Sequence, residues 1–173
     1  MKEKRKEMSR EEVRKKSEVA SNIFLESKLY QNSRVLMVYM PLGNETDTKD
    51  IIHQAFRDGK QLVLPSTNSE TGVITPVEFA PDAEFEKGGF SISEPINPKI
   101  ADKSLIDTVI VPGIAFGKDG SRVGFGKGCY DMFFKGMNVI KVGFCYDFQL
   151  CDSIPSSDHD IKMDFVITEN GIT

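Results

Sequence analysis

The stretch Asp107–Phe134, which reads DTVIVPGIAFGKDGSRVGFGKGCYDMFF, constrains the fold of this chain more than any other. It begins with a short apolar and β-branched run, Val109–Val111, which predicts a buried strand. The apolar side chains of residues 130–134 indicate a helix. Between the strand and the helix lie three glycines spaced two residues apart: Gly124, Gly126 and Gly128. A strand, a glycine-rich loop and a helix in this order direct backbone N–H groups at an anion.

Charged residues surround these glycines. Arg122 and Lys127 flank them, and Asp131 stands in the first turn of the predicted helix. An acid at that position either complements the helix dipole or holds a metal ion against bound phosphates. The glycine spacing fits neither the Walker loop, which needs Ser or Thr at position 128, nor the dinucleotide fingerprint, which needs a third Gly at position 129. A tight turn is the alternative interpretation, but the charged residues favour a phosphate-binding loop.

Composition narrows the class of protein. With 173 residues, of which 39% are hydrophobic, the chain is expected to form one domain over residues 1–173 with a proper core. Its net charge of −4 argues against a nucleic-acid partner. We expect a cytoplasmic protein without a membrane partner, because no apolar run approaches ~18 residues and the N-terminus is charged. The three cysteines lack C-x-x-C spacing, so a zinc site is not expected.

Apolar runs alternate with helical patterns along the rest of the chain. Ser9 and Glu12 form a capping-box pattern before the first helix. The expected elements are helices at Arg10–Ser27 and between Thr48 and Gly59, and strands at Arg34–Met40, Gln61–Leu64, Ile140–Tyr146 and Phe165–Thr168, with Pro65 closing the second strand. A strand–helix–strand order favours parallel pairing with a right-handed crossover. The sequence therefore predicts a three-layer α/β/α fold with a mainly parallel central sheet, whose functional groups gather at the carboxyl ends of the strands.

The glycine-rich stretch resembles the signature of the 5-formyltetrahydrofolate cyclo-ligases (methenyltetrahydrofolate synthetases), P-G-x-x-F-x-x-x-G-x-R-x-G-x-G-x-G-x-Y-D. The chain has every fixed position of it: Pro112, Gly113, Phe116, Gly120, Arg122, Gly124, Gly126, Gly128, Tyr130 and Asp131. The family usually has Tyr before the final Tyr-Asp, so Cys129 departs from the pattern. The resemblance extends from about Lys4 to Glu169. It includes a G-x-x-E-P segment at Glu94–Pro95.

This resemblance implies an activity. Members of the family convert 5-formyltetrahydrofolate to 5,10-methenyltetrahydrofolate with ATP and Mg²⁺, releasing ADP and phosphate through a phosphorylated formyl intermediate. ATP and 5-formyltetrahydrofolate are the implied partners, and we expect a monomer or a weak homodimer. Two alternatives stay open: a ligase of the same fold with another substrate, and a folate- or nucleotide-binding protein with little turnover.

The resemblance also implies site residues. Arg122 and Lys127 would be catalytic. The ATP-binding residues would be Arg122, Gly124, Phe125, Gly126, Lys127, Gly128, Cys129 and Tyr130. The folate-binding residues would be Met40, Glu45, Phe125, Lys127 and Cys129. Asp131 and Asp160 would hold Mg²⁺, the second through a P-x-x-x-x-D-x-x-x-D segment. Without the resemblance, Glu45 would be interpreted as a solvated loop acid and Asp160 as a surface acid or a helix cap. His159 is expected to be structural or close to substrate rather than catalytic.

The last prediction concerns the basic residues near the N-terminus. They are frequent between Lys2 and Lys16 and are expected to make a solvated helix face. In the family, a Lys and an Arg near the start of this helix reach the ATP phosphates, and the alignment on Met8 places both before Met1. Lys2, Lys4 or Arg5 would have to replace them from a frayed terminus, so poor ATP affinity is expected.

Overall fold

The computed structural model describes the chain except for residues 81–84, 88–92, 97 and 156–159. Two features of the sequence analysis therefore fall on residues outside the described ranges. They are His159 and the glycines expected before Glu94. Within them, a seven-stranded sheet has the order β12-β11-β9-β6-β1-β2-β3. Its strands are β1 (Val35–Met37), β2 (Gln61–Thr67), β3 (Ile74–Phe79), β6 (Thr108–Val111), β9 (Ile140–Phe144), β11 (Phe165–Thr168) and β12 (Gly171–Ile172). The pairs from β2 across to β11 are parallel, whereas β3 and β12 are antiparallel edges.

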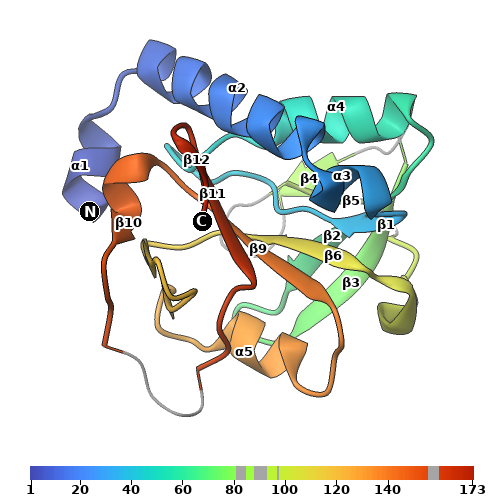
Figure 1. Cartoon of the computed structure of the whole chain (residues 1–173). Helices are drawn as coiled ribbons and strands as arrows, with labels where there is room; N and C mark the ends of the chain where they lie inside the picture. The colour runs from blue at the N-terminus through green and yellow to red at the C-terminus, as the bar shows by residue number, and fades with distance from the viewer. Residues whose placement is uncertain (81–84, 88–92, 97, 156–159) are drawn as a thin grey trace.

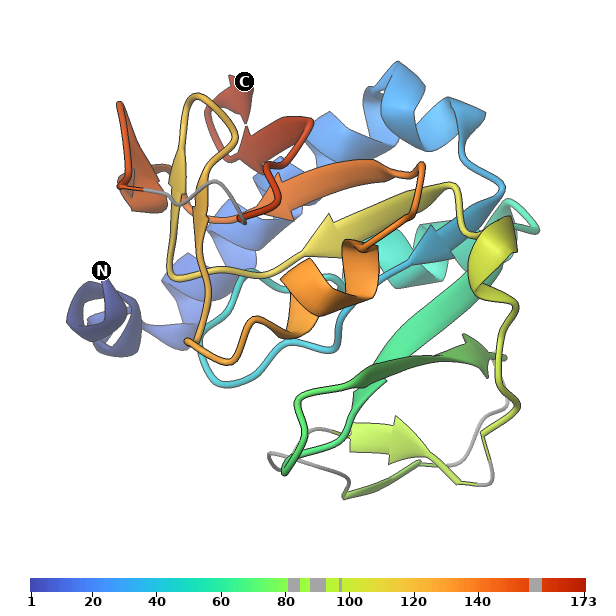
Figure 2. The same ribbon diagram turned by 90° about the horizontal axis from the view of Figure 1, so that it is seen from below.

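Helices cover both faces of this sheet. One face carries α2 (Arg10–Glu26), α3 (Lys28–Asn32) and α4 (Lys49–Arg57), as Figure 1 shows. The opposite face carries α5 (Cys129–Phe134), which lies in front of the sheet in Figure 2. A short first helix, α1 (Lys2–Glu7), lies at one end of the molecule beside the 3₁₀ turn Asp147–Gln149. The predicted three-layer α/β/α fold with a mainly parallel sheet is confirmed.

Strand alternation divides the apolar side chains between two cores. Along β1, Leu36 packs towards α2 and α4, whereas Met37 packs towards α5. Along β6, Ile110 joins the first core, while Val109 and Val111 join the second. All five side chains are 0% exposed, because a central parallel strand is covered on both faces. Burial on both faces holds the carboxyl ends of these strands in fixed positions.

Local signals define the helix ends as predicted. The Ser9 hydroxyl accepts from Glu12 N at 3.2 Å, and the Glu12 carboxylate accepts from Ser9 N at 2.8 Å. This reciprocal capping box begins α2. Helix α4 begins after Thr48 and ends before Gly59, whose φ of 69° stops the helix at the predicted position.

Three strands differ from their predicted bounds by two residues or more. The strand expected at Ile140–Tyr146 ends at Phe144. The strand expected at Arg34–Met40 pairs only over Val35–Met37. The strand expected to close at Pro65 instead continues to Thr67, because Pro65 lies opposite Pro76 of β3. The carbonyl of Pro76 accepts from Ala101 N at 2.9 Å, so the backbone polar groups of Pro76 point away from β2. The missing N–H groups of this pair therefore remove no bond of the β2–β3 ladder.

Smaller strands were not foreseen. The region between the β6 strand and the glycines forms a hairpin of β7 (Ala115–Gly117) and β8 (Arg122–Val123), and β10 (Leu150–Cys151) pairs with β7. A separate two-stranded sheet joins β4 (Phe85–Lys87) to β5 (Ser93–Pro95). Among the helices of the described residues, none is long and apolar enough to cross a membrane.

Candidate active site

The predicted site residues lie on the segments that follow β1 and β6 and on the segment before β11 that carries Asp160. Glu45 follows β1, and Gly113 follows β6. The glycine loop, residues 124–128, leads from β8 into α5. Gly128 begins α5 with a φ of 62°, a left-handed conformation that side chains other than glycine disfavour. Helix α5 has six residues, so the loop's own backbone and the neighbouring side chains, more than a helix dipole, determine its affinity for anions.

Arg122 lies beneath the glycine loop. Its side chain is 6% exposed, and its Nη2 donates to Asp131 Oδ2 at 3.2 Å. Its guanidinium lies 5.4 Å from the centre of the Tyr130 ring. A Cβ at position 124 would lie only 2.7 Å from Nη1, so a side chain there would clash with the guanidinium where it now lies. The buried Nε has no hydrogen-bond partner in the described part of the chain.

Asp131 receives contacts from two directions. Besides Arg122, its Oδ1 accepts from Ile161 N at 3.1 Å. The segment that carries Ile161 is held in turn by the β7–β8 hairpin, because Met163 N donates to Gly120 O at 2.8 Å. Asp160 is exposed and directly precedes Ile161, so the two acids that the resemblance paired lie on neighbouring segments.

These two carboxylates are the candidate Mg²⁺ ligands. Across the described ranges, no group of three or more His, Cys, Asp or Glu residues forms a metal site. Mg²⁺ needs only one or two protein carboxylates, since water and phosphate oxygens complete its octahedron. The Asp131 side chain is 26% exposed, which leaves it partly accessible to such an ion. The donor set therefore fits Mg²⁺ bound together with a polyphosphate.

Lys127 and Cys129 connect the glycine loop to the loop between β2 and β3. Lys127 is exposed, and its Nζ donates to Ser69 O at 2.7 Å. The Cys129 sulfur lies 3.2 Å from the point where a Cβ of residue 72 would stand. Cys129 also packs against the core beneath α5. Cys129 therefore has a packing role, and the loop after β2 borders the site.

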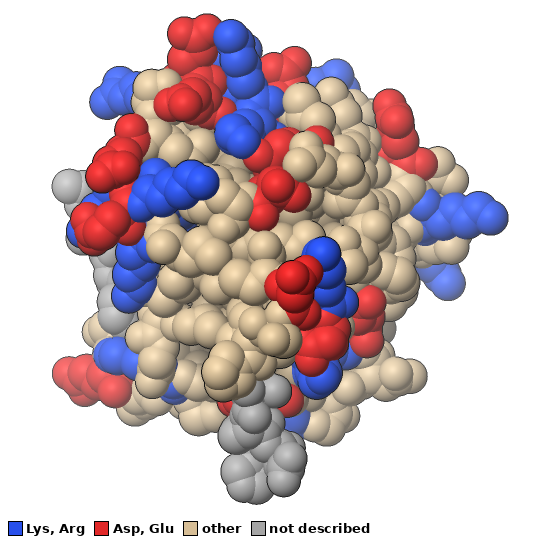
Figure 3. Space-filling model, turned by 60° about the vertical axis from the view of Figure 1, so that its left-hand side comes forward, with Lys and Arg blue, Asp and Glu red and all other residues tan. Residues whose placement is uncertain are grey.

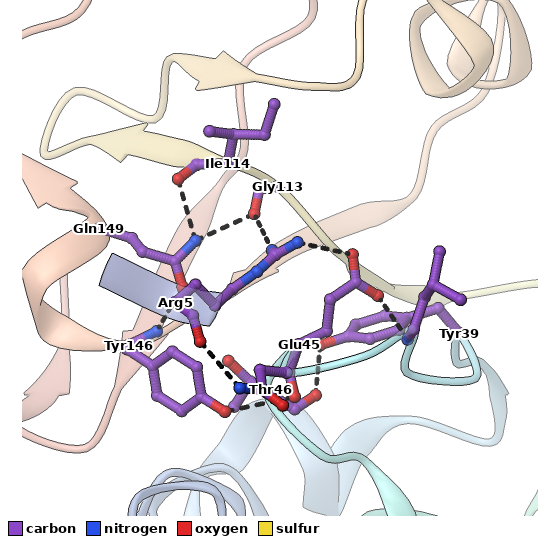
Figure 4. Close-up of polar contacts among 10 residues, drawn as sticks. Arg5, Tyr39, Glu45, Thr46, Gly113, Ile114, Tyr146 and Gln149 are labelled. Carbon is purple, nitrogen blue, oxygen red and sulfur yellow. Dashed lines mark hydrogen bonds and ion pairs between the residues drawn. The ribbon is translucent and has the colours of Figure 1, made fainter. Parts of the chain in front are cut away.

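Glu45 is buried, which contradicts its interpretation as a solvated loop acid. The residue is 6% exposed, and its Oε2 accepts from Leu42 N at 3.0 Å. Burial raises the pKa of Glu45, while the Leu42 N–H and the charge of Arg5 oppose that rise. Its Oε1 lies 3.7 Å from Arg5 Nη2, as Figure 4 shows. Met40, the other expected folate contact on this loop, is partly buried against the core beneath α2.

The expectation of a frayed, solvated N-terminus is wrong for Arg5. Residues Lys2–Glu7 form α1, and the Arg5 side chain is only 14% exposed. The guanidinium lies 5.8 Å from the Phe125 ring centre, and Lys2 Nζ lies 5.4 Å from the same ring. Lys4 instead lies over Phe148, with its Nζ 4.7 Å from that ring centre. Helix α1 thus reaches the glycine loop, where Phe125 is 55% exposed.

Sequence reasoning missed the residues that hold this arrangement together. The Asn44 amide donates to Arg5 O and Met8 O, both at 2.9 Å, and so binds the end of α1. Gln149 is buried and donates through Nε2 to Gly113 O at 3.0 Å and Ile114 O at 2.9 Å. Its position shortly after β9, at the functional edge of the sheet, was the available signal. For Arg5 no local signal exists, because many basic neighbours share its sequence context.

The surface around α1 carries both acidic and basic side chains. Figure 3 shows acidic and basic side chains interspersed around a mostly uncharged area. A cavity of about 470 Å³ opens beside α1 and is lined by Lys4, Glu7, Met8, Glu12, Lys16, Asp147, Phe148, Glu169 and Asn170. Apart from Lys4, which the sequence offered as a replacement for the family's N-terminal basic pair, none of the predicted site residues lines it.

The fold and the site define an α/β protein with a glycine-rich loop, a partly buried Arg–Asp pair and a buried carboxylate at the carboxyl edge of a mainly parallel sheet. The chain belongs to the 5-formyltetrahydrofolate cyclo-ligase family, whose model matches residues 1–169. The resemblance drawn from the glycine-rich motif is therefore confirmed.

Individual relatives agree. The chain is 26% identical to a 5-formyltetrahydrofolate cyclo-ligase of Mus musculus, over 98% of this chain and 90% of the relative. It is 30% identical to a probable 5-formyltetrahydrofolate cyclo-ligase of Caenorhabditis elegans, over 94% of this chain and 85% of the relative. Among solved structures, a 5,10-methenyltetrahydrofolate synthetase of Aquifex aeolicus has a TM-score of 0.85 and 31% identity, over 98% of this chain and 86% of that one.

Proposed function

We propose that the chain is an ATP- and Mg²⁺-dependent ligase that cyclises 5-formyltetrahydrofolate to 5,10-methenyltetrahydrofolate, with release of ADP and phosphate. One observation carries the proposal beyond family membership. Arg122 from β8, Asp131 from α5 and the backbone of Ile161 meet in one cluster under the glycine loop. Such a cluster combines a cation for phosphate oxygens with a carboxylate for a divalent ion, which is what phosphoryl transfer requires of a protein.

The chemistry explains why no nucleophilic side chain is needed. The formyl oxygen of an amide-like group is a poor leaving group, so it first attacks the γ-phosphorus of ATP, and ADP departs. N10 of the folate then attacks the activated carbon and loses its proton. The bond from that carbon to the phosphorylated oxygen breaks, and phosphate leaves. The protein contributes chiefly positioning and neutralisation of charge.

Arg122, Lys127 and the N–H groups of the glycine loop would stabilise the charge on the phosphate oxygens. The guanidinium is held in place by Asp131 and Tyr130, so it is already oriented before ATP binds. Lys127 is exposed on the loop, from which it would exchange its contact with Ser69 O for phosphate. The exposed Phe125 ring would contact the adenine or the pterin.

Asp131 and Asp160 would hold Mg²⁺, which when bound lowers the negative charge of the triphosphate. The residues of the chain have separate tasks. Asp131 anchors Arg122, and Ile161 N fixes the orientation of the Asp131 carboxylate. On the folate side, Glu45 and Met40 follow β1, and a buried carboxylate suits the adjacent N–H donors of a pterin ring.

The experiment mixes the protein, ATP, Mg²⁺ and 5-formyltetrahydrofolate and follows the absorbance of the methenyl product together with ADP release. We expect methenyl product and ADP to form in equal amounts, and neither to form without ATP. Lys118→Ala serves as the matched control, since the contact described for the Lys118 side chain is an exposed ion pair with Asp152. Nucleotide and folate binding without product would favour the binding protein, and ADP release without methenyl product would favour a ligase for another substrate.

A further inference from the structure

Arg5 makes a contact whose purpose the proposed reaction leaves unexplained. Its Nη2 lies 3.7 Å from Glu45 Oε1, and its Nη1 donates to Gly113 O at 3.3 Å (Figure 4). The two side chains are 14% and 7% exposed, so this is a largely desolvated pair. An exposed ion pair contributes little, whereas a desolvated carboxylate depends on the cation beside it.

The guanidinium is held where three parts of the chain meet: α1, the loop after β1 and the end of β6. Asn44, which precedes Glu45, donates to Arg5 O and so binds α1 to the same loop. On the far side, Gln149 donates to Gly113 O, the carbonyl that also accepts from Arg5. The position of the guanidinium is therefore determined from both ends and does not depend on a flexible terminus.

Among the residues that the structure describes, the other groups that interact with Glu45 carry no positive charge. Leu42 N donates to its Oε2, and the Tyr146 hydroxyl donates to its backbone oxygen at 3.2 Å. The phenols of Tyr39 and Tyr130 also interact with the carboxylate, and burial raises the pKa of both phenols, so they stay neutral. Arg5 is thus the cation that compensates for the burial of Glu45.

We propose that Arg5 is a positioning residue for the folate: it fixes the orientation of the Glu45 carboxylate and supplies the positive charge that keeps it an acceptor for the N–H donors of the pterin ring. The inference rests on the proposed function, in which Glu45 contacts the folate. It differs from the role expected for the basic N-terminus, because this guanidinium faces a carboxylate and a carbonyl instead of phosphates.

The first test needs no substrate. The ionisation of Glu45 is followed by carbon-detected NMR of its carboxyl group in the wild type, in Arg5→Met and in Arg5→Lys. The pKa of Glu45 is expected to be higher in Arg5→Met than in the wild type, with Arg5→Lys between them. Lys6→Met is the matched control on the same helix, since the Lys6 side chain is 73% exposed and pairs with Glu3. Equal titration curves in the wild type and a folded Arg5→Met would overturn the inference.

The second test measures 5-formyltetrahydrofolate binding by calorimetry across the weakly acidic to neutral range. Arg5→Met is expected to bind roughly tenfold more weakly at neutral pH, the equivalent of one charge-assisted contact. As the pH is lowered, the folate affinity of Arg5→Met should also begin to fall at a higher pH than the folate affinity of the wild type. In a Glu45→Gln background the Arg5 substitution should no longer change the pH profile, a result that mere misplacement of α1 would not produce. Unaltered affinity and profile in Arg5→Met refute the inference, whereas a wild type that never binds the folate refutes the proposed function instead.

Discussion

Replacing Arg122 with Met should separate catalysis from stability. The substitution removes the guanidinium that donates to Asp131 Oδ2 at 3.2 Å but keeps a long apolar side chain against Tyr130. Breaking a fully buried pair costs about 3–5 kcal/mol. The cost here should be smaller for two reasons. Asp131 is 26% exposed, so water can solvate it, and the unpartnered buried Nε disappears with the guanidinium. We expect a loss of about 2 kcal/mol, or about 4–8 °C in melting temperature.

The catalytic effect should be much larger in relative terms. If Arg122 stabilises charge that develops on the transferred phosphoryl group, its loss should lower kcat by about 10²–10³-fold, equivalent to ~2.7–4 kcal/mol. Arg122→Lys should recover part of that rate, since it restores the charge without the planar fork.

The assay is initial-rate formation of the methenyl product at saturating ATP and folate, with melting temperature measured on the same samples. Lys118→Ala, at an exposed pair, should change neither quantity beyond ordinary surface effects. A folded Arg122→Met that retains kcat within a few-fold of the wild type would refute the assignment of Arg122 to phosphoryl transfer.

Three further predictions concern other residues of the site. Lys127→Ala should lower turnover by roughly 10²-fold and leave the melting temperature nearly unchanged, because the side chain is exposed; near wild-type turnover removes Lys127 from the reaction. Asp131→Asn and Asp160→Asn should each raise the Mg²⁺ concentration needed for half-maximal rate. The loss of activity in the double variant should be smaller than the sum of the two single losses, because both residues would serve one ion. An unchanged Mg²⁺ dependence in either single variant excludes that residue from the metal site. Since burial raises the folded-state pKa of Glu45, the folded protein binds that proton at a higher pH than the unfolded chain does, so Glu45 adds stability as the pH falls from neutral through its folded-state pKa. Glu45→Gln should remove this part of the pH dependence in denaturant titrations, and a profile identical to the wild type would contradict it.

Local patterns were sufficient for most of the architecture. The capping box before α2, the stop at Gly59 and the buried run of β6 are each decided by residues within a few positions of one another. Strand–helix–strand order then implies a parallel sheet, because the crossover has one favourable hand. The glycine-rich motif was long enough to indicate the family directly, and the family model bears this out. Strand ends were less predictable, since Pro65 is tolerated because the β2–β3 register places it at a pair that forms no ladder hydrogen bond.

The composition of the site was decided by tertiary structure. Asp131 and Ile161 are separated by 30 positions, and Arg5 and Gly113 by 108, so no local period connects either pair. Their contacts follow from the order of the strands and from the return of the chain over the β7–β8 hairpin. Likewise, the sequence by itself determined that Arg5 is a cation among many on a helix. Only the packing of α1 against the loop after β1 decided that its charge faces a buried carboxylate, because burial depends on which distant surfaces meet.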